Sequence, residues 1–228
     1  MGIASDLRAS VLQSAIQGKL TKQLASDGNA DILIEQINNI RSEGIKNKTI
    51  RNVKCESTFD IEDIYYNVPN NWRWMRFGQI VSNHDGERKP VAKDKRINKK
   101  GTYPYYGATG AIDVVDSYLF DGEYLMIGED GGNFYTNRDN SFIARGKFWA
   151  NNHVHVVKPI GMNIMYLKYF LDSCNLPALG LINGIAVPKL NQENMNSILV
   201  PIPPLSEQER IVAKLDKLLP LCDSLYES

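Results

Sequence analysis

The C-terminal end of the chain carries the most regular pattern of apolar and polar positions. Apolar residues recur there with spacings of 4, 3, 4 and 3, at Ile211, Leu215, Leu218, Cys222 and Leu225. This alternation keeps one seam of an α-helix against a partner helix and is typical of coiled coils. The pattern therefore predicts that residues 205–228 are the start of a helix that packs on another helix.

The start of this helix is marked by its flanking residues. Ser206 stands at an N-cap position, and Glu209 three residues later completes a capping box. Three prolines between residues 201 and 204 cannot donate backbone hydrogen bonds and favour an extended connector before the helix. Pro220 removes one hydrogen bond inside the helix, so we expect a bend there.

Two shorter helices are predicted at the N-terminal end. The first covers about residues 5–17, with Ser5 as its N-cap and Gly18 as a left-handed stop. The second covers about residues 30–43 and ends at Gly44. The apolar residues that we expect on one side of each helix are Leu7, Val11, Leu12, Ala15 and Ile16 in the first, and Leu33, Ile37 and Ile40 in the second.

The middle of the chain changes to short β-type runs, aromatic residues and glycines. We expect a buried helix at residues 164–174, because its residues are apolar on nearly all sides. The expected strands are residues 111–119, 124–127, 154–157 and 198–202. The predicted fold class is α+β, with one mixed α/β domain flanked by long α-helices that form a coiled-coil spacer. Its parts are a helical region (1–45), a linker (46–66), the domain (67–204) and the start of the spacer helix (205–228).

Composition narrows the class of protein. The chain has 228 residues, of which 43% are hydrophobic, and 26 basic residues balance 26 acidic ones. A nucleic-acid-binding protein with this balance has to gather its cations on one surface. Its cysteines, Cys55, Cys174 and Cys222, have unrelated spacings and suit a reducing compartment. Apolar runs stay well short of the roughly 20 residues of a membrane span, and the first residues do not resemble a signal peptide. We therefore expect a cytoplasmic protein that does not enter a membrane.

The densest basic stretch is residues 86–101. Its basic residues are Arg88, Lys89, Lys93, Lys95, Arg96, Lys99 and Lys100, against Glu87 and Asp94. A local excess of this kind neutralises phosphates and releases counterions, although a solvated loop has the same composition. Tyr103, Tyr105 and Tyr106 follow, and their rings can stack or donate hydrogen bonds to a sugar–phosphate edge.

Polar residues suited to base edges occur in two further segments. Residues 128–139 form a glycine-rich loop with Asn133, Asn137 and Arg138, and residues 151–152 are a pair of asparagines, Asn151 and Asn152. Amides and guanidinium groups read bases bidentately, but the same residues also satisfy ordinary turns. Lys189 stands where it can contact phosphate, and Asn191 is equally suited to cap a helix.

His153 and His155 are two residues apart on an expected strand, so we expect both on one face. The spacing permits a metal site, but no third ligand is evident nearby, and a partly buried strand face is the better interpretation. We predict no metal site.

The sequence lacks the motifs of the enzymes that act on DNA. It has no phosphate-binding loop, no Asn/Asp-Pro-Pro-aromatic motif of an amino-methyltransferase, and no nuclease spacing around residues 85–89. We therefore predict no catalytic residues. The purified chain should show no methyltransferase, ATPase or nuclease turnover.

Several stretches resemble the specificity subunits of type I restriction–modification systems. Residues 203–216 (PPLSEQERIVAKLD) resemble the start of the long helix after a target-recognition domain in this family, and residues 7–20 (LRASVLQSAIQGKL) its far end. Residues 68–74 (VPNNWRW) are similar to the beginning of the recognition domain, and 103–110 (YPYYGATG) with 184–191 (GIAVPKLN) to its body.

The resemblance implies sequence-specific recognition of one half of a two-part DNA target. Its partners are double-stranded DNA, methyltransferase subunits and a restriction/translocase subunit. S-adenosylmethionine, ATP and Mg²⁺ are expected on those partners, with no cofactor on this chain. The expected DNA-contacting residues are Arg88, Lys89, Lys93, Lys95, Arg96, Lys99, Lys100, Tyr103, Tyr105, Tyr106, Asn133, Arg138, Asn151, Asn152 and Lys189. The expected helix-interface residues are Leu7, Val11, Ile16, Ile211, Leu215, Leu218, Cys222 and Leu225.

The order of the parts differs from the family pattern, because the end of the family helix precedes the domain and its beginning follows it. The chain is therefore a half subunit that pairs with a copy of itself, or a fragment of a longer chain. A homodimer through the helices is favoured, although the chain's own helix at residues 7–20 can also cover the apolar seam. Two other functions stay open: a stand-alone DNA-modifying or DNA-cleaving enzyme, which a turnover assay would reveal, and a coiled-coil assembly module without DNA contact, which a salt-dependent DNA titration would reveal.

Overall fold

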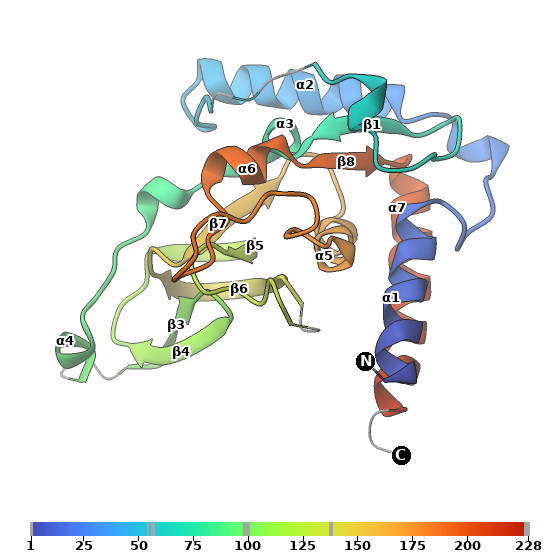
Figure 1. Ribbon diagram of the computed structural model, residues 1–228. Helices are drawn as coiled ribbons and strands as arrows, with labels where there is room; N and C mark the ends of the chain where they lie inside the picture. The colour runs from blue at the N-terminus through green and yellow to red at the C-terminus, as the bar shows by residue number, and fades with distance from the viewer. Residues whose placement is uncertain (1, 54, 56–57, 98–100, 137–138, 226–228) are drawn as a thin grey trace.

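A six-stranded sheet forms the centre of the chain in the computed structural model, which describes residues 2–53, 55, 58–97, 101–136 and 139–225 (Figure 1). The strand order is β2-β7-β5-β6-β3-β4. Neighbouring strands are antiparallel, except that β3 and β6 are parallel. The strands are β2 (Val81–Asn83), β3 (Tyr103–Gly107), β4 (Gly110–Val115), β5 (Phe120–Gly128), β6 (Ser141–Ala150) and β7 (Val154–Pro159).

The ribbon of β5 and β6 bends at a pair of facing glycines. Gly122 and Gly146 are partners in the register, and both have φ in the left-handed region, at 138° and 72°. This backbone favours glycine, because a Cβ atom strains it. Tyr124 lies opposite Ala144 in the register, yet its ring packs on that of Phe148, with 5.6 Å between centroids. The sheet therefore curls, and loops from its different strands come together.

The second half of β5, from Leu125 to Gly128, is buried on both faces of the sheet. Leu125 and Ile127 of β5 belong to the main core, which also contains Leu33 and Ile37 of α2 (Asp31–Lys46). Met126, between them, points into a smaller cluster with aromatic rings from β5 and β6. Helix α5 (Ile164–Ser173) packs on the sheet and is buried, as its largely apolar sequence predicts. The predicted mixed α/β arrangement is thus confirmed.

A second, two-stranded ribbon closes the body beside α2 (Figure 1). It pairs β1 (Arg73–Arg76) with β8 (Leu199–Ile202) in antiparallel register. The short helices around it are α3 (Phe77–Ile80) and α6 (Gln192–Ser197), while α4 (Lys93–Ile97) lies at the far end of the sheet. Short 3-10 turns occupy Ala25–Asp27, Ile61–Asp63 and Asp85–Glu87. Asn191 caps α6 by accepting from the Asn194 backbone N–H at 2.8 Å.

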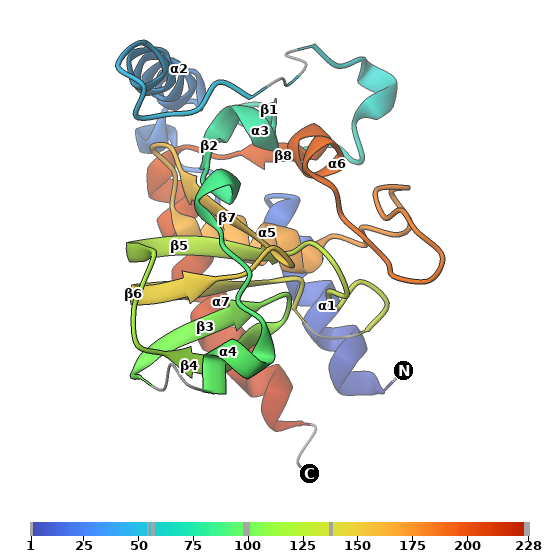
Figure 2. The same ribbon diagram turned by 90° about the vertical axis from the view of Figure 1, so that its left-hand side faces the viewer.

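Helices α1 (Ile3–Ile16) and α7 (Leu205–Ser224) lie side by side along one flank, with the two termini at the same end of the pair (Figures 1 and 2). Leu12 and Ala15 of α1 pack with Ile211 and Leu215 of α7. The chain's own N-terminal helix therefore covers the predicted seam. The seam within α7 differs from the prediction at two positions. Leu219 is buried in place of Leu218, which is half-buried, and Leu225 is 50% exposed.

Other predicted interface residues fall in different places. Ile16 packs into the main core with α2 and α5, whereas Leu7 is 43% exposed and Val11 is half-buried. Cys222 is buried, as the seam predicts. The fully buried carboxyl group of Glu207 joins α7 to the segment before β1, because it accepts from Trp72 Nε1 at 2.8 Å.

Several predicted helix ends are wrong. Helix α7 begins at Leu205 with Pro204 as N-cap, so Ser206 lies inside the helix. The Ser206 Oγ donates to Asp27 at 2.8 Å and caps no backbone group. Helix α1 begins before Ser5, with Gly2 as its N-cap, but it ends as predicted at Gly18, which has φ 70°.

The second N-terminal helix is longer than expected. Gly44 lies inside α2, where the side chain of Ile50 packs against it, and a Cβ atom at Gly44 would lie 2.5 Å from Ile50 Cδ1. The left-handed residue that follows α2 is Lys48, with φ 63°. At the other end of the chain, Pro220 lies inside α7 without ending it.

Strands were predicted less completely than helices. Strands β5, β7 and β8 coincide with predicted ones, and β4 ends at Val115 rather than at residue 119. Strands β1, β2, β3 and β6 were missed. Strand β3 contains Pro104, and β6 is interrupted by the polar run at residues 145–147, so neither shows a continuous β-type pattern.

Within the described part of the chain, no helix combines the length and the apolar character needed to cross a bilayer.

Candidate nucleic-acid interface

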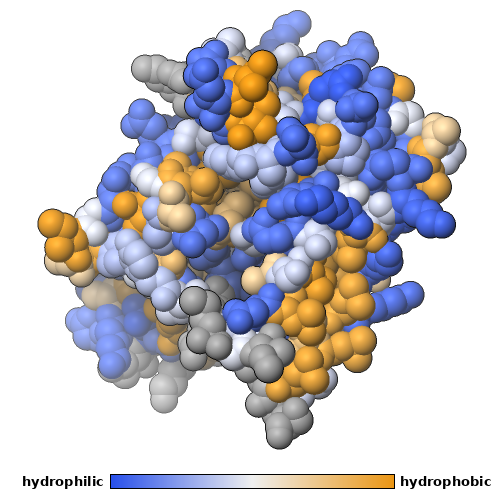
Figure 3. Space-filling view, turned by 45° about the vertical axis from the view of Figure 1, so that its right-hand side comes forward, coloured by the Kyte–Doolittle hydropathy of each residue, from blue (hydrophilic) through white to orange (hydrophobic). Residues whose placement is uncertain are grey.

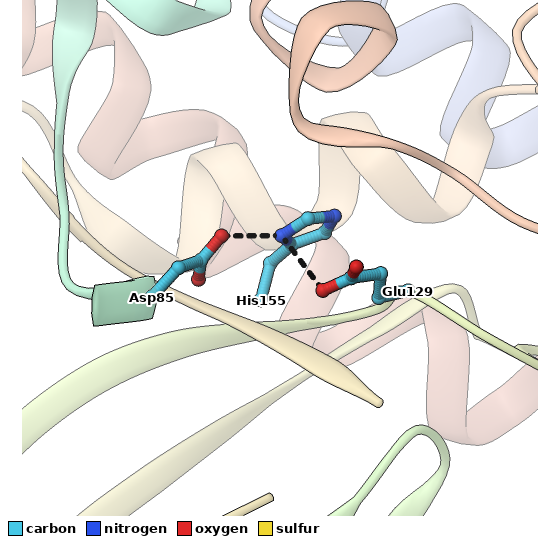
Figure 4. Close-up of side chains that lie close together, drawn as sticks. All are labelled: Asp85, Glu129 and His155. Atoms are coloured by element: carbon cyan, nitrogen blue, oxygen red, sulfur yellow. Dashed lines mark hydrogen bonds and ion pairs between the residues drawn. The ribbon is translucent and has the colours of Figure 1, made fainter. Parts of the chain in front are cut away.

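A buried group of charged side chains holds together segments that are far apart in the sequence (Figure 4). His155 on β7 is 1% exposed, and its Nδ1 lies 2.6 Å from Asp85 Oδ2 and 3.6 Å from Glu129 Oε2. Arg88 Nη1 lies 2.5 Å from the same Glu129 oxygen, and Arg88 Nη2 lies 3.6 Å from Asp85 Oδ2. We call these four residues the buried quartet.

Hydrogen bonds and nearby positive charge determine the charge of Asp85. Burial raises the pKa of Asp85, but its hydrogen bond to His155 and the charges of His155 and Arg88 outweigh burial and hold the pKa below its ordinary value. Asp85 is therefore a carboxylate and can only accept. His155 Nε2 faces the carbonyl oxygen of Leu190 at 2.8 Å, which also only accepts. Both ring nitrogens of His155 therefore lie within hydrogen-bond distance of an acceptor oxygen, which fixes the orientation of the ring.

The quartet does not suit a metal ion, although the ligand atoms of Asp85, Glu129 and His155 lie within 4.8 Å of one another. The ring nitrogens of His155 are already engaged by Asp85 and by the Leu190 carbonyl oxygen, and the Arg88 guanidinium already pairs with both carboxylates. His153 does not share the strand face with His155, contrary to prediction, because β7 begins at Val154. His153 lies in the preceding turn, with Nδ1 3.2 Å from Asp130 Oδ2.

Backbone hydrogen bonds extend the quartet into a group of loops at one end of the curled sheet. Lys89 N donates to Ala150 O at 3.2 Å, and Asn151 N donates to Tyr106 O at 3.1 Å. The bonds that complete the group run from Glu129 N to His153 O (2.8 Å), from Gly131 N to Pro188 O (3.0 Å) and from Leu190 N to Glu129 O (2.9 Å). We call residues 85–89, 106–108, 128–131, 150–153 and 183–190 the loop cluster.

Some of the predicted DNA-contacting residues are exposed on or beside this cluster. Lys89 and Asn152 are exposed on the cluster itself, and Lys93 and Lys95 are exposed on α4. Lys189 is 43% exposed, and its Nζ lies 3.0 Å from Glu129 Oε1 and 3.2 Å from Asp130 Oδ1. The hydrogen bond to Glu129 raises the pKa of Lys189, which keeps it a cation.

The two predicted arginines of the basic stretch have structural roles instead. Arg88 belongs to the buried quartet, and its Nη1 also donates to Val154 O at 2.8 Å. Arg96 Nε donates to Asp113 at 2.8 Å, and its guanidinium lies over the Tyr105 ring, 4.6 Å from the centroid. Each side chain is only 13% exposed, so neither is free to bind a phosphate.

The predicted tyrosines are mainly packing residues. Tyr105 is 1% exposed and its hydroxyl accepts from Val91 N at 3.0 Å, so its ring cannot stack on a base. Tyr106 packs on Phe142 and Phe148, and burial raises the pKa of its phenol. Tyr103 is half-buried against Tyr118, with 5.2 Å between ring centroids.

The predicted amides are divided in the same way. Asn151 is 5% exposed and accepts from His153 N at 2.8 Å, so it shapes a turn. Asn133 donates to Asp139 O at 3.0 Å within its own loop. Lys99, Lys100 and Arg138 lie outside the described residues.

The comparisons with known proteins agree with this arrangement. The family model for the type I restriction modification DNA specificity domain matches residues 69–226, which is more than half of the chain. The chain belongs to this family.

Relatives of this specificity family include a predicted type I restriction enzyme specificity subunit of Haemophilus influenzae. The two are 38% identical over 149 residues, covering 65% of this chain and 37% of that protein. The EcoAI specificity subunit of Escherichia coli is 25% identical over 244 residues, covering 96% of this chain and 40% of that protein. The chain thus spans about two fifths of the length of these relatives.

Solved structures show the same fold. The HsdS subunit from Thermoanaerobacter tengcongensis superimposes with a TM-score of 0.53 at 17% identity, over 87% of this chain and 50% of that one. The S subunit from M. genitalium superimposes with a TM-score of 0.50 at 16% identity, over 96% of this chain and 53% of that one.

Sequence reasoning missed two features of this specificity chain. The quartet was invisible because its members come from three separate segments, and only the apolar context of His155 hinted at burial. The second feature is the run Ile185-Ala186-Val187, in which Ile185 is fully exposed. Its flanking Gly184 and Pro188 are turn residues and were the available signal.

Proposed function

We propose that this chain recognises DNA for a type I restriction–modification complex, with the loop cluster and α4 as its contact surface. The observation that carries the proposal is the loop cluster of a family member, in which exposed lysines and Asn152 stand on a buried, charge-neutralised base. A fixed base holds polar side chains in one geometry, which direct readout of base edges requires. In this proposal the chain reads one half of a two-part target.

Catalysis belongs to the partners in this proposal. Methyltransferase subunits would supply S-adenosylmethionine chemistry, and a restriction/translocase subunit would use ATP and Mg²⁺. The chain itself would bind no cofactor and would act in the cytoplasm as a non-catalytic specificity subunit.

The α1–α7 pair would act as the spacer and as a homodimer interface. Figure 3 shows apolar side chains gathered toward the lower end of the molecule, where both termini lie in Figure 1. Exposed leucines near this end are Leu7 (43%), Leu221 (63%) and Leu225 (50%). A patch of this kind favours association of two helix pairs.

Replacing Lys89, Lys93 and Lys95 together by alanine tests the contact surface. All three side chains are exposed, so the fold should be unchanged while phosphate contacts are lost. We expect weaker binding to every DNA sequence, and a slope of log K against log salt that flattens by up to about 0.9 per lost contact. The measurement is a salt titration of DNA binding by the chain with its methyltransferase subunit.

The matched control replaces three exposed lysines outside the proposed surface, Lys19, Lys22 and Lys46. If the wild type and the first triple variant have equal slopes of log K against log salt, α4 and Lys89 do not contact DNA.

A further inference from the structure

Residues 183–189 form a small closed hairpin that follows α5. Asn183 N donates to Lys189 O at 2.9 Å, and Lys189 N donates back to Asn183 O at 2.7 Å. Gly184 has φ 86°, and a Cβ atom there would lie 2.5 Å from Val187 O, so the turn requires glycine. Figure 2 shows the orange segment between α5 and α6 projecting beyond the sheet on the right.

The end of this hairpin is apolar. Ile185 is fully exposed, at 105% of its reference area, and Val187 is 56% exposed, with Ala186 exposed between them. We call these three residues the apolar tip. Single exposed apolar side chains are common and do not by themselves indicate a binding site. Three in succession on a projecting turn are unusual, because nothing in the fold is stabilised by them.

The base of the hairpin is anchored to the buried quartet. Gly131 N donates to Pro188 O, Lys189 pairs with Glu129 and Asp130, and the next residue, Leu190, is fully buried. His155 Nε2 also lies 2.8 Å from Leu190 O. The position of the tip is therefore set before any partner binds, which reduces the entropy that binding would otherwise lose.

The surroundings of the tip favour DNA over a protein pocket. The hairpin is part of the loop cluster, which also presents Lys89, Asn152 and His153. The carboxylates at its base, Glu129 and Asp130, are paired with cations and only 12% and 19% exposed. An anionic duplex can therefore approach the tip without facing unpaired negative charge there.

We propose that the apolar tip is a wedge that contacts the bases of the bound duplex, with Ile185 as its leading side chain. Apolar side chains on rigid elements press against or between base steps, while nearby cations hold the phosphates. The proposal rests on the proposed function, since it assumes that the loop cluster faces DNA. It adds a contact that depends on burial of apolar surface and not on charge.

The test compares DNA binding by the chain in complex with its methyltransferase subunit, for the wild type and for Ile185→Ser and Ile185→Leu. Wild-type binding to a sequence selected from a random duplex library establishes the reference. Ile185→Ser should weaken binding to that sequence about 10-fold to 100-fold, as loss of a buried large aliphatic side chain does. Its salt slope should equal that of the wild type, because no cation is lost. Ile185→Leu should bind within about threefold of the wild type, because it keeps the apolar volume.

The matched control is Ile32→Ser on α2, another exposed isoleucine (64%) away from the loop cluster. It should bind DNA as the wild type does, and all variants should share one unfolding temperature. Unchanged DNA affinity of Ile185→Ser would overturn the wedge and leave the proposed function standing. Loss of methyltransferase assembly in the absence of DNA would also overturn it, because the tip would then be a protein contact. A wild-type complex that binds no DNA would refute the proposed function and the wedge with it.

Discussion

Replacing Asp85 by asparagine should lower the free energy of unfolding by about 3–5 kcal/mol at neutral pH. The side chain is 7% exposed, and the substitution leaves His155 and the guanidinium of Arg88 with one carboxylate between them. Removing one partner of a buried ion pair leaves the other charge buried without a partner to offset its lost hydration. Urea unfolding of the two proteins would measure the difference.

The pH dependence of this difference has a defined sign. The pKa of Asp85 lies below its ordinary value in the folded chain, so its stabilising effect is present above the unfolded value of 3.8. The effect is lost as pH falls through the folded pKa, and the gap between wild type and variant should close in acid. The control is Glu87→Gln, two residues away, where the carboxylate is 57% exposed and should matter by less than about 0.5 kcal/mol. Equal losses for both variants would mean that the quartet does not hold the loops.

Changing Leu7 and Leu221 together to aspartate should convert a homodimer into monomers. Both side chains are exposed in the single chain, at 43% and 63%, so charges there disturb only an interface between copies. Sedimentation equilibrium over a range of concentrations would report the change, and the unfolding temperature of the monomer should stay the same.

Two controls separate association from folding. Ile40→Asp, on α2 and 48% exposed, should remain dimeric. Leu215→Asp should unfold the helix pair itself, because Leu215 is fully buried against α1. A wild-type chain that stays monomeric at high concentration would contradict the homodimer and assign the patch to another subunit.

The sequence predicted the helices well because their signals are local and periodic. The stretch Ile164–Ser173 is apolar on nearly all sides and is a buried helix, and Gly18 ends α1 in the left-handed conformation. The seam of α7 was displaced by one residue at Leu219, because Leu218 and Leu219 are both apolar and the choice depends on where α1 lies. The apolar pattern of one helix does not determine where the partner helix packs against it.

The candidate site was predicted less well because it is assembled by tertiary contacts. Arg88 and Arg96 look like surface cations in the sequence, but acidic partners at Glu129 and Asp113 take them into ion pairs. Strand β6 was missed because Gly146 interrupts its pattern, yet that glycine is what lets the ribbon curl. The curl brings the loops together, and no local signal reports it.

The most direct test of DNA recognition is a binding selection from a random duplex library, using the chain assembled with its methyltransferase subunit. Two copies related by a two-fold axis read their half-sites in opposite orientations. We therefore predict enrichment of one short sequence that occurs twice as an inverted repeat, with a spacer of constant length and no preferred sequence. If the selected duplexes have the same sequence composition as the starting library, the proposal that this chain reads DNA is contradicted.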